Sequence, residues 1–347
     1  MRIGIIGAAG AGKSAVFHAL TGLAPLPGQA EAKNRARLGQ IKVGDARLDE
    51  LESIYGSKKK VPVELTLLDF APNPKEKKAG AALDATLLPM VRDLDALLLV
   101  IAAFSGSADF LPALKSIEDE LVFADFDQID RRLERMRKEK GGSDFDRGVL
   151  EKCLKWLEGG APLRALEMTA QELRSFSSFG FLSRKPALAV INCDIESAAQ
   201  PANPDEREYA AIRHLDLFRL PAVFEAELWE LGPDERNELL AEAGLKASAR
   251  DRLVSALYER LGLITFYTAG EPEAHAWPLE NGATALEAAG RIHSDIARGF
   301  IRAEVVGYED FVALRSDAKV KEAGKLRLEG RDYIMRDGDI IHIRFKV

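Results

Sequence analysis

The chain has 347 residues, of which 47% are apolar and 30% are charged, and its formal net charge is −7. This composition is typical of a soluble globular protein, and a length above roughly 100–200 residues per domain predicts two or three domains. The negative net charge excludes a global attraction to nucleic acid or anionic lipid, so any RNA contact must come from a local basic patch.

Cysteine usage and hydropathy exclude further classes. The two cysteines, Cys153 and Cys193, lie far apart without Cys/His spacing, which excludes a disulfide framework and a zinc site. An apolar strand begins almost at Met1, which leaves no room for a signal peptide, and no apolar run is long enough to span a bilayer. We therefore expect a cytoplasmic protein with no membrane partner.

The first predicted elements surround a phosphate-binding motif. Residues 2–6 are short and apolar, as in a buried strand, and residues 15–20 have a helical pattern. Between them, residues 7–14 read GAAGAGKS and fit the pattern of Gly, four free positions, Gly, Lys and Ser or Thr. A Gly/Ala-rich turn can match this pattern by chance, but the flanking strand and helix favour a phosphate loop.

The chemistry of this motif predicts a nucleotide site. Backbone N–H groups of the loop and of the helix N-terminus point at the phosphates, Lys13 adds positive charge, and the Ser14 hydroxyl can hold Mg²⁺. We therefore expect ATP or GTP with Mg²⁺, and a catalytic role for Lys13 in neutralising phosphate charge. The residues expected to bind the nucleotide in this segment are Gly7, Ala8, Ala9, Gly10, Ala11, Gly12, Lys13, Ser14 and Ala15.

A carboxylate for the same metal ion is predicted further along. Residues 61–69 read as a strand that ends in Asp69. Switch NTPases place at this point the carboxylate that reaches Mg²⁺ through water. The alternative is an ordinary turn aspartate at a strand end.

Two other parts of a switch NTPase are missing. The loop at residues 21–37 would supply a Thr to Mg²⁺, but no Thr occurs between Thr21 and Thr66. Pro72 stands where such proteins have a Gly whose N–H meets the γ-phosphate, and proline has no N–H to donate. The lysines within residues 75–78 are most simply part of a solvated loop, although they lie near enough in sequence to touch phosphate.

A helical hairpin is predicted after a buried strand at residues 96–101. From Glu118, apolar residues recur at spacings of four and three, a coiled-coil-like stripe, until Gly141 breaks it and a second helix returns through Trp156. The basic tip of this arm is equally compatible with a solvated face and with an RNA or protein contact. Its residues are Arg131, Arg132, Arg135, Arg137, Lys138 and Lys140.

The C-terminal half returns to strands. Residues 188–192 read as a buried strand ending in Asn192, where a purine-reading loop would sit, and residues 220–224 read as a short strand. A capping box at residues 284–287 opens a helix, and residues 331–347 read as a hairpin. One helix against a short mixed sheet suggests a ubiquitin-like fold.

Histidine, the usual general base, is sparse and scattered. None of the five histidines adjoins a Ser or Cys with a third orienting group, so each is expected to be structural. The pattern places His18 and His293 on helical faces and His214 in an amphipathic helix.

Several longer runs of the sequence resemble the YchF family, the Obg-like ATPases, nearly end to end. The likeness is strongest from residue 261 onward, where the runs are similar to that family's TGS domain. These runs are TAG at 268–270, AAGRIH at 288–293, GFIRAEV at 299–305 and EAGK at 322–325. Shorter family-like runs are DARL at 45–48, ELVFAD at 120–125 and EAEL at 225–228.

The resemblance implies an α/β P-loop NTPase domain with an inserted helical coiled-coil arm and a C-terminal TGS domain of the ubiquitin-like β-grasp, α+β type. The expected boundaries are 1–110 with 185–260 for the NTPase domain, 111–184 for the insertion and 261–347 for the TGS domain. The resemblance also implies a preference for ATP over GTP and association with ribosomes.

Besides the missing switch Thr and the Pro72 position, the chain departs from the family pattern at three further places. The family has Asn at the position of Gly10, an acid at the position of Ile195, and a His in the loop after Phe104. One hypothesis is a nucleotide-binding switch protein, associated with ribosomes or structured RNA, with slow or impaired hydrolysis. The other is a non-enzymatic ribosome- or RNA-binding module with a degenerate P-loop domain. The intact phosphate loop favours the first, whereas Pro72 and Ile195 favour the second.

Overall fold

The computed structural model describes residues 1–24, 36–70, 82–83, 86–104, 110–139, 143–245 and 248–346. They form two compact units, the first made of Met1–Ile41 with Thr66–Leu253 and the second of Lys42–Leu65 with Val254–Val347. The expected domain division leaves residues 42–65 in the nucleotide domain. They belong to the C-terminal unit because their strand pairs with its sheet and their helix packs on it.

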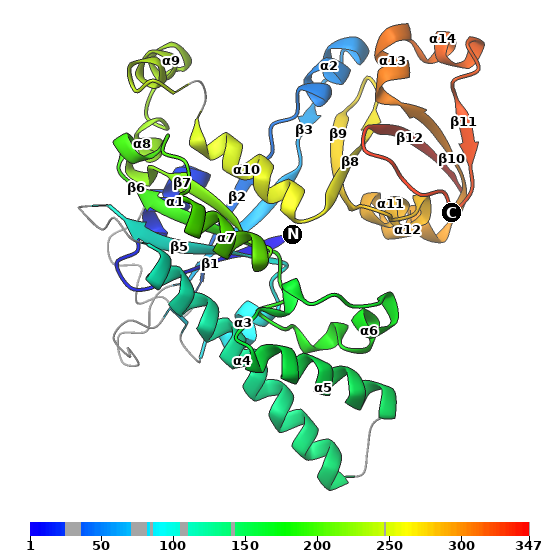
Figure 1. Ribbon diagram of the computed structural model, residues 1–347. Coiled ribbons are helices and arrows are strands. Elements are labelled where there is room, and N and C mark those ends of the chain that lie inside the picture. The colour runs from blue at the N-terminus through cyan, green and yellow to red at the C-terminus, as the bar shows by residue number, and fades with distance from the viewer. Residues whose placement is uncertain are drawn as a thin grey trace. The chain divides into compact units, whose positions relative to one another are not determined.

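The first unit is built on a six-stranded sheet with the order β2-β4-β1-β5-β6-β7 (Figure 1). β1 pairs in parallel with β4 and β5, β5 pairs with β6, and β6 pairs with β7. The neighbouring strands β5 and β6 are buried along almost their whole length, as continuous apolar strands of a parallel sheet should be. The strand bounds are β1 Arg2–Ile6, β2 Ala36–Lys42, β4 Glu64–Phe70, β5 Ala96–Ala103, β6 Ala187–Cys193 and β7 Asp216–Leu220.

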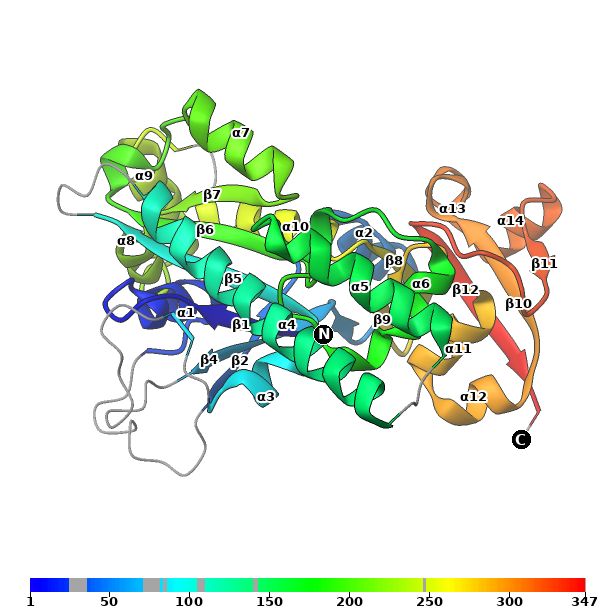
Figure 2. The same ribbon diagram turned by 60° about the horizontal axis from the view of Figure 1, so that its bottom comes forward.

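Helices cover this sheet (Figure 2). On one face, Leu114 and Leu121 of the long helix α4 pack in one apolar cluster with Leu99 and Ile191 of the strands. Elsewhere α1 packs on α8, and the indole N–H of Trp229 donates to the carbonyl of Ala19 over 2.9 Å. The helices are α1 Lys13–Thr21, α3 Leu88–Arg92, α4 Leu111–Glu139, α7 Pro204–Ile212, α8 Ala222–Glu227, α9 Pro233–Glu242 and α10 Ala249–Arg260.

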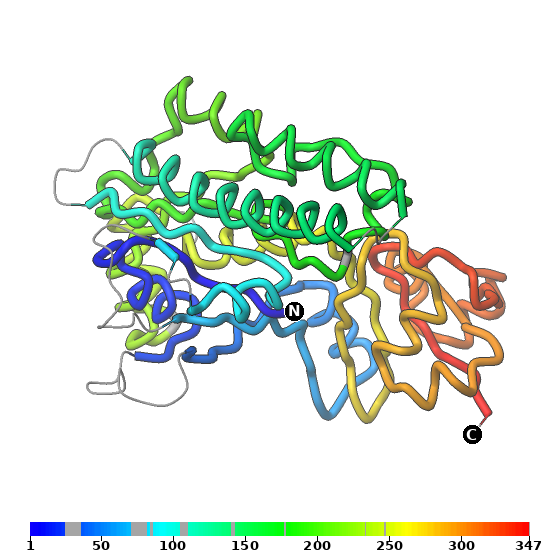
Figure 3. The backbone as a smooth tube through the Cα atoms, turned by 90° about the horizontal axis from the view of Figure 1, so that it is seen from below, coloured from blue at the N-terminus to red at the C-terminus, as the bar shows by residue number. Residues whose placement is uncertain are grey.

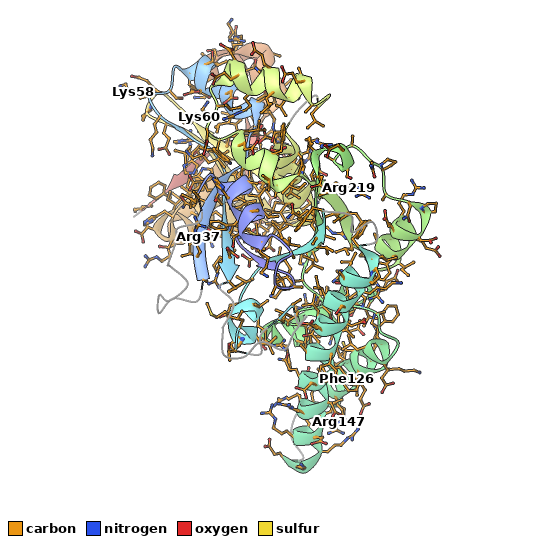
Figure 4. All side chains as sticks on the ribbon, turned by 90° about the vertical axis from the view of Figure 1, so that its left-hand side faces the viewer. Arg37, Lys58, Lys60, Phe126, Arg147 and Arg219 are labelled. Atoms are coloured by element: carbon orange, nitrogen blue, oxygen red, sulfur yellow. The ribbon has the colours of Figure 1, made fainter. Side chains whose placement is uncertain are left out.

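A helical hairpin projects from the first unit and has an apolar core of its own (Figure 1). It is made by α4 and α5, which spans Asp144–Glu158 and begins at the N-cap Ser143. Ile129 and Leu133 of α4 pack against Val149 and Cys153 of α5. Figure 4 labels Phe126 and Arg147, one on each helix. Four short elements belong to the same unit, the helix α6 Ala170–Ser175 and the 3₁₀ turns Leu163–Ala165, Ser177–Phe179 and Ile195–Ser197.

Two buried acids hold α4 at the base of the hairpin. Asp125, fully buried, accepts hydrogen bonds from the N–H groups of Leu182 at 2.9 Å and Ser183 at 2.7 Å, and pairs with Nη1 of Arg92 at 3.1 Å. About two turns earlier, the fully buried Glu118 forms an ion pair with the guanidinium of Arg164, in the segment after α5. Burial raises the pKa of Asp125, and the hydrogen bonds and the Arg92 charge partly offset that shift. The long helix is therefore fixed to the sheet by polar contacts as well as by apolar packing.

The second unit contains a mixed sheet with the order β11-β10-β12-β8-β9-β3. β8 and β9 are antiparallel, β10 is antiparallel to β12 and β11, and β12 is parallel to β8. The predicted capping box at Thr284 opens α11, whose Ala285 and Ala289 pack on the sheet. The strands are β3 Lys60–Val61, β8 Leu263–Ala269, β9 Ala274–Glu280, β10 Phe300–Gly307, β11 Arg327–Glu329 and β12 Asp339–Phe345. The helices are α2 Ala46–Tyr55, α11 Ala285–Ile292, α12 Ser294–Arg298, α13 Tyr308–Leu314 and α14 Asp317–Glu322.

Several local predictions are wrong, among them the helical position of His293, which lies in extended backbone between α11 and α12. Residues 220–224 do not form one strand, because β7 ends at Leu220 and α8 begins after Pro221. Residues 331–347 do not form a hairpin, because β12 pairs with β10 and β8. His214 lies after the end of α7 in a left-handed turn with a φ of 49°.

The α/β architecture itself is confirmed. Among the helices in the described part of the chain, none is long and apolar enough to cross a membrane.

Candidate functional site

The segment between β1 and α1 has a backbone that requires glycine. Gly12 lies in the left-handed region with a φ of 87°, and a Cβ there would stand 2.0 Å from Nδ2 of Asn192. A Cβ at Gly7 would stand 2.3 Å from the carbonyl oxygen of Val100 on β5. Both distances are shorter than any van der Waals contact allows, so the two outer glycines of the motif are fixed by packing against neighbouring strands.

Lys13 folds back over this loop. Its Nζ donates to the carbonyl oxygens of Gly7 at 2.6 Å and Ala8 at 2.8 Å. The helix that follows has no side-chain cap and no acid in its first turn, so its first N–H groups have no carboxylate competing for them. Ala9, Gly10 and Ser14 are exposed, Ala15 is half-buried and Ala11 is buried, so the loop opens to solvent on one side.

Ser14 and Asp69, distant in sequence, meet next to the loop. Asp69 lies on β4 opposite Ile5 of β1, and its Oδ2 accepts a hydrogen bond from the Ser14 hydroxyl over 3.1 Å. Asp69 is only 8% exposed. A hydroxyl and a carboxylate oxygen are ligands that Mg²⁺ prefers, and Mg²⁺ usually completes its shell with waters and substrate phosphates. The two side chains therefore fit a Mg²⁺ ion held jointly by the protein and a nucleotide.

Electrostatics around Asp69 favour a cation. Burial raises the pKa of Asp69, while the hydrogen bond from Ser14 and the positive charges of Lys13 and Arg37 act in the opposite direction. A divalent cation beside the carboxylate would relieve the cost of its buried charge.

Asn192, predicted to lie where a base-reading loop begins, contacts the phosphate loop. It lies at the end of β6 and is 4% exposed. Its Nδ2 donates to the carbonyl of Ala11 over 3.2 Å, and its Oδ1 accepts from the N–H of Ala222 over 3.4 Å. The side chain thus joins the phosphate loop to the start of α8. Ile195 follows in a 3₁₀ turn and offers no polar atom from its side chain.

One residue near the site was not singled out by the sequence. Arg37 on β2 lies with its guanidinium 4.5 Å from the ring centre of Phe17, and Nη2 donates to the carbonyls of Leu23 at 2.6 Å and Ala24 at 2.5 Å (Figure 4). It therefore fastens the start of β2 to the end of α1 and adds positive charge on the side of Asp69. No motif signals such a role, because an arginine at the start of a strand is common.

Several other predictions lie outside the described residues. These are the loop at 25–35, Pro72 and the lysines of residues 75–78, and the loop at 105–109 after Phe104.

The histidines show no catalytic grouping in the part of the chain that the structure describes. His275 on β9 contacts Glu273 through Nδ1 at 2.9 Å and stacks on Trp277, and burial lowers its pKa. His293 separates α11 from α12 and accepts the N–H of Asp295 through Nδ1 at 3.1 Å.

The described basic side chains of the hairpin tip are exposed, apart from the half-buried Arg132, and acids of the same helix partly neutralise them. Lys140 lies outside the described residues. Nε of Arg131 lies 2.9 Å from a carboxylate oxygen of Asp127, and Lys138 lies 3.7 Å from Glu134. Such exposed pairs contribute little to stability, so these basic side chains can leave the acids of their own helix and pair with anionic groups of a partner.

Comparison with known proteins gives consistent matches. Residues 263–346 match a family model described as YchF-GTPase_C, protein of unknown function (DUF933). The chain is 36% identical to the ribosome-binding ATPase YchF of Bacillus subtilis (strain 168) over 99% of each chain. It is 34% identical to the ribosome-binding ATPase YchF of Escherichia coli O157:H7, over 100% of this chain and 99% of that one.

Solved structures agree with these matches. The Schizosaccharomyces pombe YchF GTPase superposes with a TM-score of 0.86 at 27% identity, over 99% of this chain and 97% of that one. A GTP-binding protein from Pyrococcus horikoshii OT3 shares the fold, with a TM-score of 0.59 at 17% identity over the full length of both chains.

Proposed function

The chain belongs to the YchF family, and from that premise we propose that it binds a purine nucleoside triphosphate with Mg²⁺ and associates with the ribosome. The single observation that carries the nucleotide site is the 3.1 Å contact between Ser14 and Asp69 beside the glycine-constrained loop. It brings a hydroxyl and a carboxylate together at the N-terminus of α1, where phosphates bind.

Within this proposal each site residue has a distinct role. Lys13 exchanges the carbonyls of Gly7 and Ala8 for phosphate oxygens and neutralises charge that develops during phosphoryl transfer. Ser14 holds Mg²⁺ directly, and Asp69 reaches it through water. Asn192 positions the loop through Ala11 instead of reading the base alone. The remaining loop residues, Ala8, Ala9, Gly10, Gly12 and Ala15, offer backbone N–H groups.

We also propose how the domains divide these tasks. The nucleotide domain comprises residues 1–41, 66–110 and 185–260, and the coiled-coil insertion at 111–184 contains α4 and α5. The TGS domain comprises residues 261–347 together with residues 42–65. A cytoplasmic location follows from ribosome association.

Slow hydrolysis is the first expected result. Switch NTPases have at this position a backbone N–H that donates to the γ-phosphate, and Pro72 lacks it. A donor of this kind contributes about 2.7–4 kcal/mol, or roughly 10²–10³-fold in rate. Single-turnover phosphate release by the isolated protein should therefore be slow although Mg²⁺-nucleotide binds, and Pro72→Gly should accelerate release without changing nucleotide affinity. Rapid release by the unaltered protein would contradict the proposal of an impaired switch, and no binding at all would favour a non-enzymatic ribosome-binding module.

Ribosome association through the arm is the second expected result. Replacing Arg131, Arg132 and Arg135 together by glutamate should reduce co-sedimentation with ribosomes about tenfold, because several phosphate contacts and their released counterions are lost. The residual binding should also depend less steeply on salt. A control variant reverses two exposed arginines outside the arm, Arg207→Glu and Arg252→Glu. Equal pelleting of the arm variant and the unaltered protein would identify the tip as a solvated face.

A further inference from the structure

The connection between β2 and β4 is built into the C-terminal unit. We call residues 42–65 the interstrand segment. Its two ends are joined by the hydrogen bond from the N–H of Val43 to the carbonyl of Val63, at 2.9 Å. Figure 3 shows this blue segment running beside the yellow strands β8 and β9. The strand that leaves it, β4, carries Asp69 only four residues after the segment ends.

Polar contacts fix the first half of the interstrand segment. Nη1 of Arg47 lies 2.6 Å from Oδ2 of Asp337, and its guanidinium stands 5.4 Å from the ring centre of Tyr267. The Tyr267 hydroxyl donates to Asp45, the N-cap of α2. The Tyr308 hydroxyl donates to Glu50 over 2.7 Å. These partners come from β8, from α13 and from the turn before β12.

Stacking and strand pairing fix the second half. The ring of Tyr55 stacks on that of Phe311 with centroids 4.9 Å apart and planes 8° apart, and its hydroxyl donates to Asp317 over 2.9 Å. The backbone N–H of Lys58 donates to the backbone carbonyl of Glu271 over 2.9 Å, and β3 then pairs in parallel with β9. The segment is therefore as firmly integrated in the C-terminal sheet as the unit's own helices.

We infer that the interstrand segment makes the C-terminal unit a positioning element for Asp69, so that Mg²⁺ binding at the phosphate loop and the order of the C-terminal unit are coupled. This inference rests on the proposed role of Asp69 as the carboxylate that reaches Mg²⁺.

Only a short stretch of β4 separates the interstrand segment from Asp69. β4 pairs with β1 from Thr66 to Asp69, and the hydroxyl of Ser14 meets its end. β4 is one continuous strand from Glu64 to Phe70, and a continuous strand acts as one rigid element, so the position of its start constrains the position of its end. The segment's other end continues β2, whose first residues include Arg37, the arginine that adds charge near Asp69. Both strands that leave the segment thus reach the proposed metal site.

Linkage then works in both directions. If order in the C-terminal unit favours the position of Asp69 that binds Mg²⁺, then Mg²⁺-nucleotide must favour that order by the same factor. A partner that binds the C-terminal unit would consequently change nucleotide affinity without touching the nucleotide.

The test uses substitutions that remove contacts of the interstrand segment and leave the residues of the phosphate loop unchanged. Arg47→Met keeps an apolar side chain over Tyr267 but removes the ion pairs with Asp45 and Asp337. Tyr55→Ala removes the ring that stacks on Phe311. Lys58→Ala is the matched control, because its ion pair with Glu271 is exposed on both sides, at 76% and 73%. Circular dichroism establishes that each variant is folded.

Two measurements decide the outcome. Hydrogen exchange of the amides of residues 66–69, in protein without nucleotide, should be about tenfold faster in Arg47→Met and Tyr55→Ala and unchanged in Lys58→Ala. Calorimetry with a non-hydrolysable ATP or GTP analogue should show that the ratio of Kd without and with Mg²⁺ falls about tenfold in the two variants, while Kd without Mg²⁺ stays constant.

Each contrary result has a distinct meaning. Unchanged exchange of residues 66–69 overturns the inference whether or not nucleotide binds. Equal loss of affinity with and without Mg²⁺ also overturns it, because the segment would then support the whole fold and not Asp69. If the unaltered protein shows no Mg²⁺-dependent binding, the proposed function fails, and the exchange measurement still judges whether the segment positions β4.

Discussion

Lys13→Ala is expected to weaken binding of a Mg²⁺-nucleoside triphosphate by about 1.5–3 kcal/mol, or roughly 10- to 150-fold. In the loop without nucleotide, the ammonium group already makes two hydrogen bonds, to Gly7 and Ala8. The loss therefore measures the difference between carbonyl and phosphate partners, and it remains large because an ammonium group attracts an anionic phosphate more strongly than it attracts a neutral carbonyl dipole.

Titration calorimetry with ATP and with GTP measures this effect. Lys155→Ala is the control, since it removes an exposed lysine from α5 of the hairpin. Turnover of the Lys13 variant should fall further than its affinity, because the same charge acts on the transition state. Unchanged affinity for both nucleotides would remove the phosphate-loop assignment.

Asp125→Ala is expected to lower the free energy of unfolding by about 3–5 kcal/mol. The substitution leaves the guanidinium of Arg92 without its buried partner and deprives the N–H groups of Leu182 and Ser183 of their acceptors. Loss of one partner from a buried pair is costly because the other charge stays out of water. Asp125→Asn, which keeps one acceptor oxygen, should lose less.

Urea unfolding followed by circular dichroism measures the loss. The matched control is Asp127→Ala on the same helix, whose carboxylate is 41% exposed and pairs with Arg131. An exposed pair of this kind contributes about 0–1 kcal/mol. If both substitutions had the same small effect, the base of the hairpin would owe its stability to apolar packing alone.

Local signals predict the order of strand, loop and helix around residues 7–14 and predict the hairpin. The loop at 7–14 combines a fixed spacing with a strand before it and a helix after it, and the structure places them in that order. Asp69 was predicted from a strand end, and its proximity to Ser14 agrees with that reading. The hairpin followed from its heptad-like spacing. The resemblance to the YchF family is confirmed by identity over the full chain.

Contacts between residues far apart in sequence determine the elements that the sequence does not predict correctly. Residues 220–224 look apolar and short, and only Pro221 indicates that a helix starts there. The turn at Asp337 does not close a hairpin, because its carboxylate accepts the N–H of Thr265, a residue of another strand. Likewise, nothing within residues 42–65 reveals that their partners lie more than 200 positions away. Such assignments depend on contacts that no local pattern encodes.

The length of α4 has a geometric consequence for the arm. From Asp125, where the helix is held, to Glu139, where it ends, the helix rises about 21 Å at roughly 1.5 Å per residue. A tilt of about 10° at the held point would therefore carry the tip through about 4 Å, given that rise. That distance exceeds the length of a hydrogen bond. A change too small to disturb the packing of the sheet is thereby amplified along the arm, and it moves the end of α4 near Glu139 farther than Arg131, which lies nearer to Asp125.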